Sequence, residues 1–404
     1  MAITNLKLRT ILNSRGSRAI EAEFTANDIT AKASAPSGAS VGKHEVPAYP
    51  LGDASKTIEE FESKIKRFIG EESNYHEIDN LMQEIDPEHK KYGASLSIAV
   101  SLAAAKLHAK VSEISMFELF ADENFTLPFP LGNIIGGGVH AGKGTPQIQE
   151  FLSIPVGAGS FEEAAFANAR VHKIAGGMLS DQVSNFTRGR NDEGAWAPKL
   201  DSVSALDILS SACERASDEL GIEIKPALDV AASEFYDKKE EKYIYKHKKI
   251  TAEEQIDLFD QLCKKFKIFS IEDPFYEEDF TSFAELNNKL KGNTLVVGDD
   301  LTTTNSDRLE TAVEKKSINA VIIKPNQIGS LTETEKVINQ AKEKEITPMV
   351  SHRSGETTDV SISHISVGFS IPVIKTGTVG GERIAKLNEL IRIEDRENLK
   401  LSTL

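Results

Sequence analysis

The chain has 404 residues, 40% hydrophobic and 27% charged, which is typical of a globular protein with room for two domains. Its net charge of −15 argues against a nucleic-acid partner, which would require a basic surface. Cys213 and Cys263 are too few and too far apart for a disulfide framework or a cysteine zinc site. The N-terminus lacks the apolar core of a signal peptide, and no apolar run approaches the about 18 residues of a membrane span. The sequence therefore predicts a cytoplasmic protein without a membrane partner.

The first part of the chain differs in pattern from the rest. Alternating apolar residues predict strands over residues 3–12 and 19–25, and helical periodicity predicts helices over 57–69, 76–85 and 94–111. Strands followed by helices indicate an α+β cap domain over residues 1–125, with a small-residue loop at 35–45 that is suited to act as a lid. Two prolines, Pro128 and Pro130, mark a boundary, so a second domain is expected over residues 126–404.

Six apolar runs in this second domain each end on a residue that can bind a metal or move a proton. From the second run onward the end residues recur at intervals of about 23 to 28 residues, the length of one strand, one helix and two loops of a (β/α) barrel. Because barrel strands end at one face, where active sites lie, we expect these residues to converge. Polar residues that merely end strands would explain one or two cases, but not six. The end residues are Asp229, Glu272, Asp299, Lys324, His352 with Arg353, and Lys375.

Three of these residues are carboxylates: Asp229, Glu272 and Asp299. Unpaired carboxylates at neighbouring strand ends repel one another, and a hard cation such as Mg²⁺ relieves the repulsion. The alternative is that each acid pairs with a nearby lysine or arginine. Three carboxylates in register favour the metal.

Two of the end residues are lysines, Lys324 and Lys375, and each follows an apolar run. Burial and nearby cations both lower the pKa of a lysine, so we expect one of them to serve as a base. A Schiff-base lysine, as in some barrel aldolases, is the competing interpretation.

Loops supply further polar groups. Segment 351–357, Ser-His-Arg-Ser-Gly-Glu-Thr, offers a hydroxyl, an imidazole and a guanidinium that suit an oxyanion. Segment 136–144 nearly matches a phosphate-binding Walker A loop, but Gly144 replaces the required Ser or Thr, which excludes an NTPase. Its His140 is still placed to reach a substrate. Segment 191–196 offers two acids, although an ordinary loop is the simpler interpretation there and at the lid.

Together these motifs resemble the enolase family over nearly the whole chain, from about residue 3 to residue 394. The likeness covers several motifs in the family's order, although Val41 and Ala195 depart from the usual pattern. The motifs include Ser37-Gly-Ala-Ser40, Gly138-Val-His140, Gln149-Glu150, Asp192-Glu193-Gly, Leu228-Asp229, Ser270-Ile-Glu272, Asp299-Asp-Leu-Thr, Lys324-Pro-Asn-Gln, Ser351-His-Arg-Ser354 and Ile374-Lys375.

The resemblance implies an α/β fold, a C-terminal (β/α)8-type barrel with an N-terminal cap, and the reversible dehydration of 2-phosphoglycerate to phosphoenolpyruvate. It implies that Lys324 removes the C2 proton and that Glu193, assisted by Glu150 and with His352 nearby, protonates the departing hydroxyl. It also implies two Mg²⁺ ions, one on Asp229, Glu272 and Asp299 and a second, with substrate, at Ser40. A homodimer or a ring of dimers is expected. The implied substrate contacts are His140, Gln149, Arg353, Ser354, Lys375 and Ser40.

Three alternatives remain from the sequence. One is a superfamily racemase or cycloisomerase acting on non-phosphorylated acids, against which the Ser351–Ser354 motif and Ser40 argue. Another is the Schiff-base aldolase, which has no need of three clustered carboxylates. The third is a binding protein that has kept the fold and lost activity, against which the intact acid, base and metal positions argue.

Overall fold

The computed structural model describes residues 1–38, 41–70, 72–120, 124–246 and 248–404. The chain begins with an antiparallel sheet of β1 (Ile3–Leu12), β2 (Arg18–Ala26) and β3 (Ile29–Ser34), in that order. The sequence prediction matched β1 and was one residue short at each end of β2. It missed β3, whose buried residues Ala31, Ala33 and Ser34 are too small to give a clear apolar alternation.

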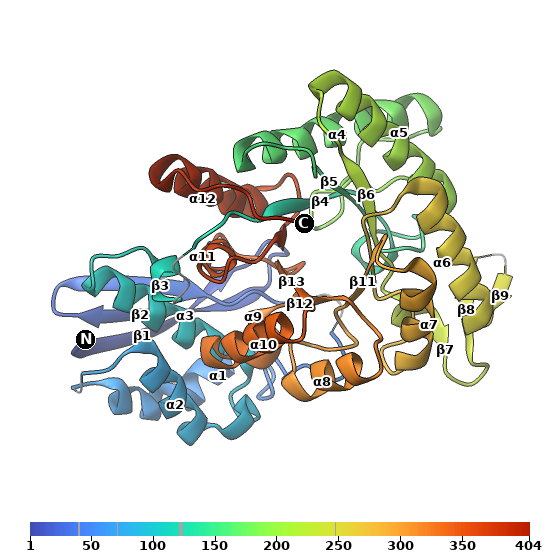
Figure 1. The fold of residues 1–404 in the computed structure, drawn as a ribbon. Coiled ribbons are helices and arrows are strands. Elements are labelled where there is room, and N and C mark those ends of the chain that lie inside the picture. The colour runs from blue at the N-terminus through green and yellow to red at the C-terminus, as the bar shows by residue number, and fades with distance from the viewer. Residues whose placement is uncertain (39–40, 71, 121–123, 247) are drawn as a thin grey trace.

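Helices pack beside this sheet (Figure 1). The predicted helix at 57–69 begins earlier, as α1 (Ala54–Phe61), because the Asp53 side chain accepts a hydrogen bond from the Lys56 N–H and caps it. It continues as the 3₁₀ helix η1 (Glu62–Phe68). The next helix, α2 (Tyr75–Ile85), starts one residue before its predicted position, and further 3₁₀ turns are η2 (Pro87–His89) and η3 (Met116–Leu119).

The helix α3 (Ala94–Val111) has its predicted bounds and corrects one expectation. Its 18 residues have a mean hydropathy of 1.2, so by length and composition this helix could cross a membrane, contrary to the sequence prediction. However, 78% of those residues are buried within the protein, and the helix packs on β2 and β3. Alanines and serines dominate it and allow this close approach. Its apolar character is therefore that of a core helix.

The second part of the chain forms a closed barrel, as predicted, in which the described residues supply eight strands in the order β10-β11-β12-β13-β14-β4-β5-β6. All adjacent pairs are parallel except the two that contain β5, which runs in the opposite direction. The strands are β4 (Phe129–Gly136), β5 (Glu150–Ile154), β6 (Lys225–Asp229), β10 (Ser270–Glu272), β11 (Leu295–Gly298), β12 (Ala320–Ile323), β13 (Thr347–Ser351) and β14 (Val373–Lys375).

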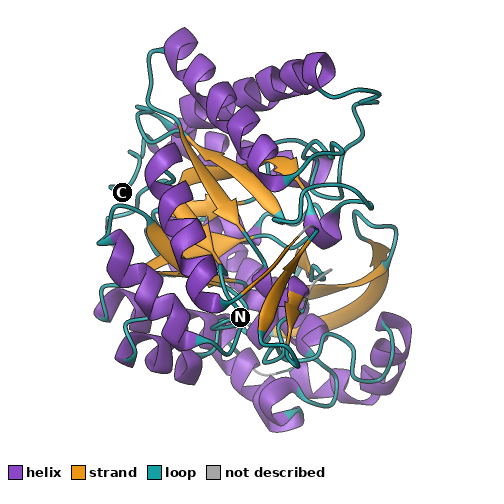
Figure 2. Ribbon diagram, turned by 90° about the vertical axis from the view of Figure 1, so that its right-hand side faces the viewer, coloured by secondary structure: helices purple, strands orange, loops and turns teal. Residues whose placement is uncertain are grey.

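Helices surround the barrel strands (Figure 2). Thr251 forms a complete capping box with Glu254, whereas Ser160 and Ser330 cap their helices by accepting only the N–H of Glu163 and Glu333. Short segments project from the strand ends, namely η4 (Gly138–His140), η5 (Ala232–Phe235) and a small sheet of β7 (Tyr236–Asp237), β8 (Lys242–Tyr245) and β9 (Lys248–Ile250). The helices are α4 (Phe161–Gln182), α5 (Ser202–Leu220), α6 (Ala252–Phe266), α7 (Phe280–Leu290), α8 (Ser306–Glu314), α9 (Pro325–Ile328), α10 (Leu331–Glu343), α11 (Ser361–Gly368) and α12 (Gly381–Glu397).

Candidate active site

The polar residues at the strand ends face the barrel interior because each continues the alternation of its strand. The interior is filled by an apolar cluster that includes Leu152, Ala227, Val297, Ile322 and Val373. Side chains two positions apart along a strand point to the same side. The residues two positions beyond this cluster therefore project into the mouth of the barrel, and they are Glu150, Asp229, Asp299, Lys324 and Lys375.

The reversed strand β5 explains why Glu150 belongs to this group. Glu150 begins its strand, yet it pairs in register with Asp229, which ends β6, and Asp229 pairs with Glu272, which ends β10. Three carboxylates thus lie side by side around the rim. Glu150 reaches the rim from the amino end of its strand, because an antiparallel strand presents its first residue there.

One small cavity of about 20 Å³ collects most of the predicted residues, and it has room for about one water molecule. Within the described residues, Glu272 reaches this group through Lys375 instead of lining the cavity. Ser40 lies outside the described residues. The predicted residues that line the cavity are His140, Gln149, Glu150, Glu193, Asp229, Asp299, Lys324, His352, Arg353, Ser354 and Lys375.

The two lysines pair with the three predicted metal ligands. Lys375 Nζ lies 2.8 Å from Asp229 Oδ2 and 2.8 Å from Glu272 Oε2, and Lys324 contacts Asp299. Burial lowers the pKa of each lysine, but the attraction of the carboxylates outweighs it, and both pKa values lie above the ordinary lysine value. The expectation of a lowered lysine pKa is therefore wrong for the protein without a bound metal ion. Neighbouring carboxylates act on the two lysines more strongly than burial and the nearby cations do.

These carboxylates nevertheless offer oxygen donors of the type that a hard divalent cation takes. Burial, Asp229 and Asp299 raise the pKa of Glu272 to about 8, a sign of excess negative charge at the rim. The buried atoms Glu272 Oε1 and Gln149 Oε1 have no hydrogen-bond partner within the described residues. Oxygen ligands with unused lone pairs are the ones that Mg²⁺ prefers. Asp229, Glu272 and Asp299 could hold such an ion.

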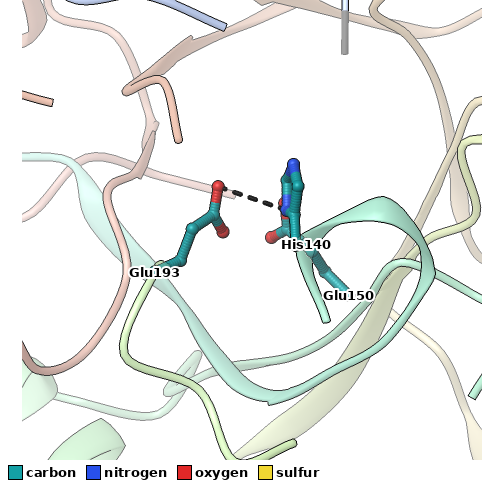
Figure 3. Close-up of side chains that lie close together, drawn as sticks. All are labelled: His140, Glu150 and Glu193. Carbon is teal, nitrogen blue, oxygen red and sulfur yellow. Dashed lines mark ion pairs between the residues drawn. The ribbon is translucent and has the colours of Figure 1, made fainter. Parts of the chain in front are cut away.

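In the same cavity, His140 lies close to two glutamates, Glu150 and Glu193 (Figure 3). His140 Nδ1 is 3.5 Å from Glu193 Oε1 and 4.0 Å from Glu150 Oε1. Burial and the Glu193 charge raise the pKa of Glu150 well above its ordinary value. Burial acts in the same direction on Glu193, but His140, His352 and Arg383 outweigh it and hold the pKa of Glu193 below its ordinary value. The surroundings thus favour the protonated form of Glu150 and the ionised form of Glu193.

The segment that follows β13 presents the predicted oxyanion-binding groups. Arg353 is buried, and its guanidinium binds Glu45 of the cap domain through two contacts, Nη1–Oε2 at 2.9 Å and Nη2–Oε1 at 3.1 Å. The Ser354 hydroxyl is buried and has no hydrogen-bond partner within the described part of the chain. A carboxylate thus occupies the guanidinium that was predicted to bind a phosphate.

Three residues in the site were missed by sequence reasoning. Glu45 reaches Arg353 from the cap domain, Asn133 Nδ2 donates to Glu193 Oε2 at 2.9 Å, and Arg383 donates to His352. None of them ends an apolar run, and each meets its partner only through the tertiary fold. The predicted lid loop at 35–45 includes Glu45, but it gave that residue no role.

A barrel whose mouth combines buried lysines, carboxylates and histidines under a contact from a cap domain defines an acid–base enzyme of the (β/α)-barrel class. The family models described as "Enolase, N-terminal domain" and "Enolase, C-terminal TIM barrel domain" match residues 3–120 and 124–400 of this chain. The chain belongs to the enolase family.

Relatives named Enolase are similar over almost their full length. The chain is 46% identical over 400 residues to the enolase of Methanosphaera stadtmanae, covering 97% of each chain. It is 43% identical to that of Methanothermobacter thermautotrophicus, with 97% of this chain and 96% of the relative covered. It is 41% identical to that of Archaeoglobus fulgidus, with 98% of each covered.

Proposed function

We propose that this site catalyses the magnesium-dependent, reversible dehydration of 2-phospho-D-glycerate to phosphoenolpyruvate and water, the glycolytic reaction of an enolase and hence of a carbon–oxygen lyase. The observation that carries the proposal is that two lysines and the Glu150–Glu193 pair line one small cavity, where Lys375 Nζ lies 3.4 Å from Glu150 Oε1. A base and an acid in one cavity suit a reaction that removes a proton from one carbon and hydroxide from the next.

Lys324 is the proposed base at C2. The proton beside an ionised carboxylate is barely acidic, because its removal creates a dianionic enediolate. Lys375, buried beside Asp229 and Glu272, would stay protonated and attract the substrate carboxylate. A lysine base with one or two Mg²⁺ ions is the pattern described for the enolase superfamily.

Glu193 is the proposed acid for the departing C3 hydroxyl, with Glu150 as the residue that supplies its proton. The raised pKa of Glu150 and the lowered pKa of Glu193 support this division, because the proton can reach Glu193 when the hydroxyl leaves. His140 lies within 4.0 Å of both carboxylates and His352 Nε2 within 3.7 Å of Glu193 Oε2, so both histidines can orient the hydroxyl.

Magnesium is the proposed cofactor. Asp229, Glu272 and Asp299 would hold one ion, which supplies positive charge against the developing enediolate. A second ion would bind with the substrate near Ser40. Arg353 and Ser354 would bind the phosphate, and Gln149, whose Nε2 donates to Asp229 Oδ2, would help to orient the carboxylate group.

The proposal extends to the organisation of the protein. We infer a cap domain over residues 1–125 with a lid loop at 35–45 and a catalytic barrel over 126–404, a division supported by the bounds of the two matched family models. We further infer a cytoplasmic homodimer or a ring of dimers, on the resemblance to enolases alone.

The direct test is turnover of 2-phosphoglycerate by the purified protein with Mg²⁺, followed by the ultraviolet absorbance of the enol phosphate. Absorbance that rises only with Mg²⁺ present, and stops on addition of a chelator, is the expected result. No turnover despite bound Mg²⁺ would instead favour a superfamily relative with another substrate, or a binding protein.

A further inference from the structure

Arg383, in the first turn of α12, is fully buried behind the site. Its guanidinium donates four hydrogen bonds in two directions. Nη1 donates to His352 Nδ1 at 2.8 Å and to the Arg353 carbonyl at 2.5 Å. Nη2 donates to the Ser354 carbonyl at 2.7 Å and to the Asp192 carbonyl at 3.1 Å. The residue does not line the cavity.

The contact with His352 determines which ring nitrogen carries the proton. An arginine has only donors, so His352 Nδ1 must accept, and a neutral imidazole then carries its proton on Nε2. His352 Nε2 lies 3.7 Å from Glu193 Oε2 and is buried without a hydrogen-bond partner within the described residues. The donor group of His352 is therefore aimed at the acid side of the cavity.

The other contacts join two segments that are distant in sequence. Asp192 precedes the proposed acid Glu193, while Arg353 and Ser354 belong to the proposed phosphate-binding segment. One rigid guanidinium fixes the backbone of both. A planar fork of donors holds carbonyls at a set spacing in a way that the single ammonium group of a lysine cannot.

We propose that Arg383 is a positioning residue that fixes His352 as the Nε2–H tautomer facing Glu193 and holds the acid segment in register with the phosphate-binding segment. The role rests on the dehydration reaction proposed above. His352 then donates to the hydroxyl that leaves C3, while Arg383 itself touches no reacting atom. Removal of the C2 proton by Lys324 does not pass through Arg383.

The neighbouring Lys386 offers a matched control. It lies one turn further along α12, is also buried, and donates to Glu356 Oε2 at 2.8 Å and to the Thr357 carbonyl at 3.0 Å. It is a cation of the same helix that supports the same loop further along the chain. Within the described residues, its hydrogen bonds go to neither His352 nor Asp192. If Arg383 served stability alone, Arg383→Lys and Lys386→Arg would have the same kind of effect.

The first test needs no variant at the arginine. In wild-type protein labelled with ¹⁵N-histidine, with His352 assigned by comparison with His352→Asn, we expect an unprotonated Nδ1 and a protonated Nε2. A protonated Nδ1 would overturn the proposal. This spectrum does not depend on turnover, so it separates failure of the positioning role from failure of the proposed function.

The second test compares two rates in Arg383→Lys and Lys386→Arg. Loss of one preorganised donor costs about 100-fold or more in kcat. We therefore expect Arg383→Lys to lower dehydration about 100-fold while exchange of the C2 proton with solvent falls less than about threefold. Lys386→Arg should lower both rates in equal proportion, if at all. In a His352→Asn background, Arg383→Lys should cost less in kcat than it does in wild type, because only the contacts with the two backbone segments are left to lose. Equal losses of both rates in Arg383→Lys would show a merely structural arginine.

Discussion

Lys324, the proposed base, contacts Asp299 at the mouth of the barrel. Lys324→Ala removes the only group assigned to abstract the C2 proton, so exchange of that proton with solvent should fall by at least about 100-fold, in line with the usual size of general-base catalysis. The exchange is measured by NMR in deuterated buffer. Lys289→Ala, which removes an exposed lysine paired with Asp257, is the control. Rapid C2 exchange in Lys324→Ala would mean that another base is used.

Glu193 permits a complementary prediction, because its role begins after the C2 proton is lost. Glu193→Gln should keep C2 exchange within about tenfold of wild type yet lower dehydration by about 100-fold or more, since an amide cannot deliver the proton. Both rates are measured on the same sample, by NMR and by absorbance. Loss of exchange together with dehydration would place Glu193 in substrate binding instead.

The Glu45 carboxylate binds both terminal nitrogens of Arg353, the position that a phosphate would use. This contact was not predicted from the sequence. If the phosphate must displace this carboxylate, Glu45→Gln should tighten inhibition by inorganic phosphate about tenfold, which corresponds to about 1.4 kcal/mol. Glu278→Gln is a matched control, because Glu278 binds His44 and Lys43 of the same loop. Unchanged or weaker inhibition would indicate that Glu45 and phosphate share Arg353.

At the scale of strands and helices, the barrel was predictable because its signal repeats. Each apolar run with a polar end predicted a barrel strand whose last residue lies at the active-site face. The interior cluster explains this pattern, because the end residues continue the inward-facing positions of their strands. Lys324 and Lys375 were therefore placed correctly in the cavity. Their pKa values were not, because those depend on the carboxylates that tertiary folding brings beside them.

The rest of the site could not be derived from local pattern. The run from Glu150 to Ile154 is buried throughout and carries no pattern that reveals its direction, so its reversal was not visible, and Glu150 was found by resemblance alone. Glu45 and Arg383 form their contacts across the cap–barrel boundary or between α12 and a loop. A buried cation in a first helical turn has no periodic signature that distinguishes it from a solvated one.

The helix α3 joins the cap to the barrel through Lys106, whose Nζ lies 2.6 Å from Asp359 Oδ2, with both side chains mostly buried. Burial raises the pKa of Asp359, but Lys106 outweighs it and holds that pKa below its ordinary value. A lowered pKa stabilises the fold above the unfolded pKa of about 3.9, and this stability is lost as the pH falls through the folded value.

Asp359→Asn should therefore reduce the free energy of unfolding at pH 7 by about 3–5 kcal/mol, the usual cost of leaving one member of a buried pair uncompensated. The difference from wild type should shrink as the pH falls below about 4. Urea unfolding at a series of pH values measures it. Glu240→Gln, which breaks an exposed pair with Lys249, should cost less than about 1 kcal/mol at any pH. A pH-independent difference would show that the charge of Asp359 contributes nothing.

For the whole molecule, the net charge of −15 is unfavourable to an anionic substrate at long range, although salt screens it beyond about 10 Å at 0.1 M. Among the described residues, three cations line the cavity and would attract such a substrate at short range, namely Lys324, Lys375 and Arg353. Each of them is already paired with a carboxylate. Substrate charge therefore has to be compensated by something beyond the side chains. A divalent cation held by Asp229, Glu272 and Asp299 would supply that charge and would weaken the attraction between these carboxylates and the lysines.

Because the carboxylates at the barrel mouth are present without substrate, Mg²⁺ alone should stabilise the protein. An ion that binds only the folded state adds about 2.7 kcal/mol at a concentration 100 times its Kd, and thermal unfolding at a fixed scan rate should shift upward accordingly. Glu272→Gln should abolish the shift, because it removes a proposed ligand and one of the negative charges that would attract the ion. Asp257→Asn, on the outer face of α6, should retain it. If Asp229, Glu272 and Asp299 bind the ion together, loss of any one of them should weaken its binding. A shift that persists in Glu272→Gln would therefore place the ion elsewhere.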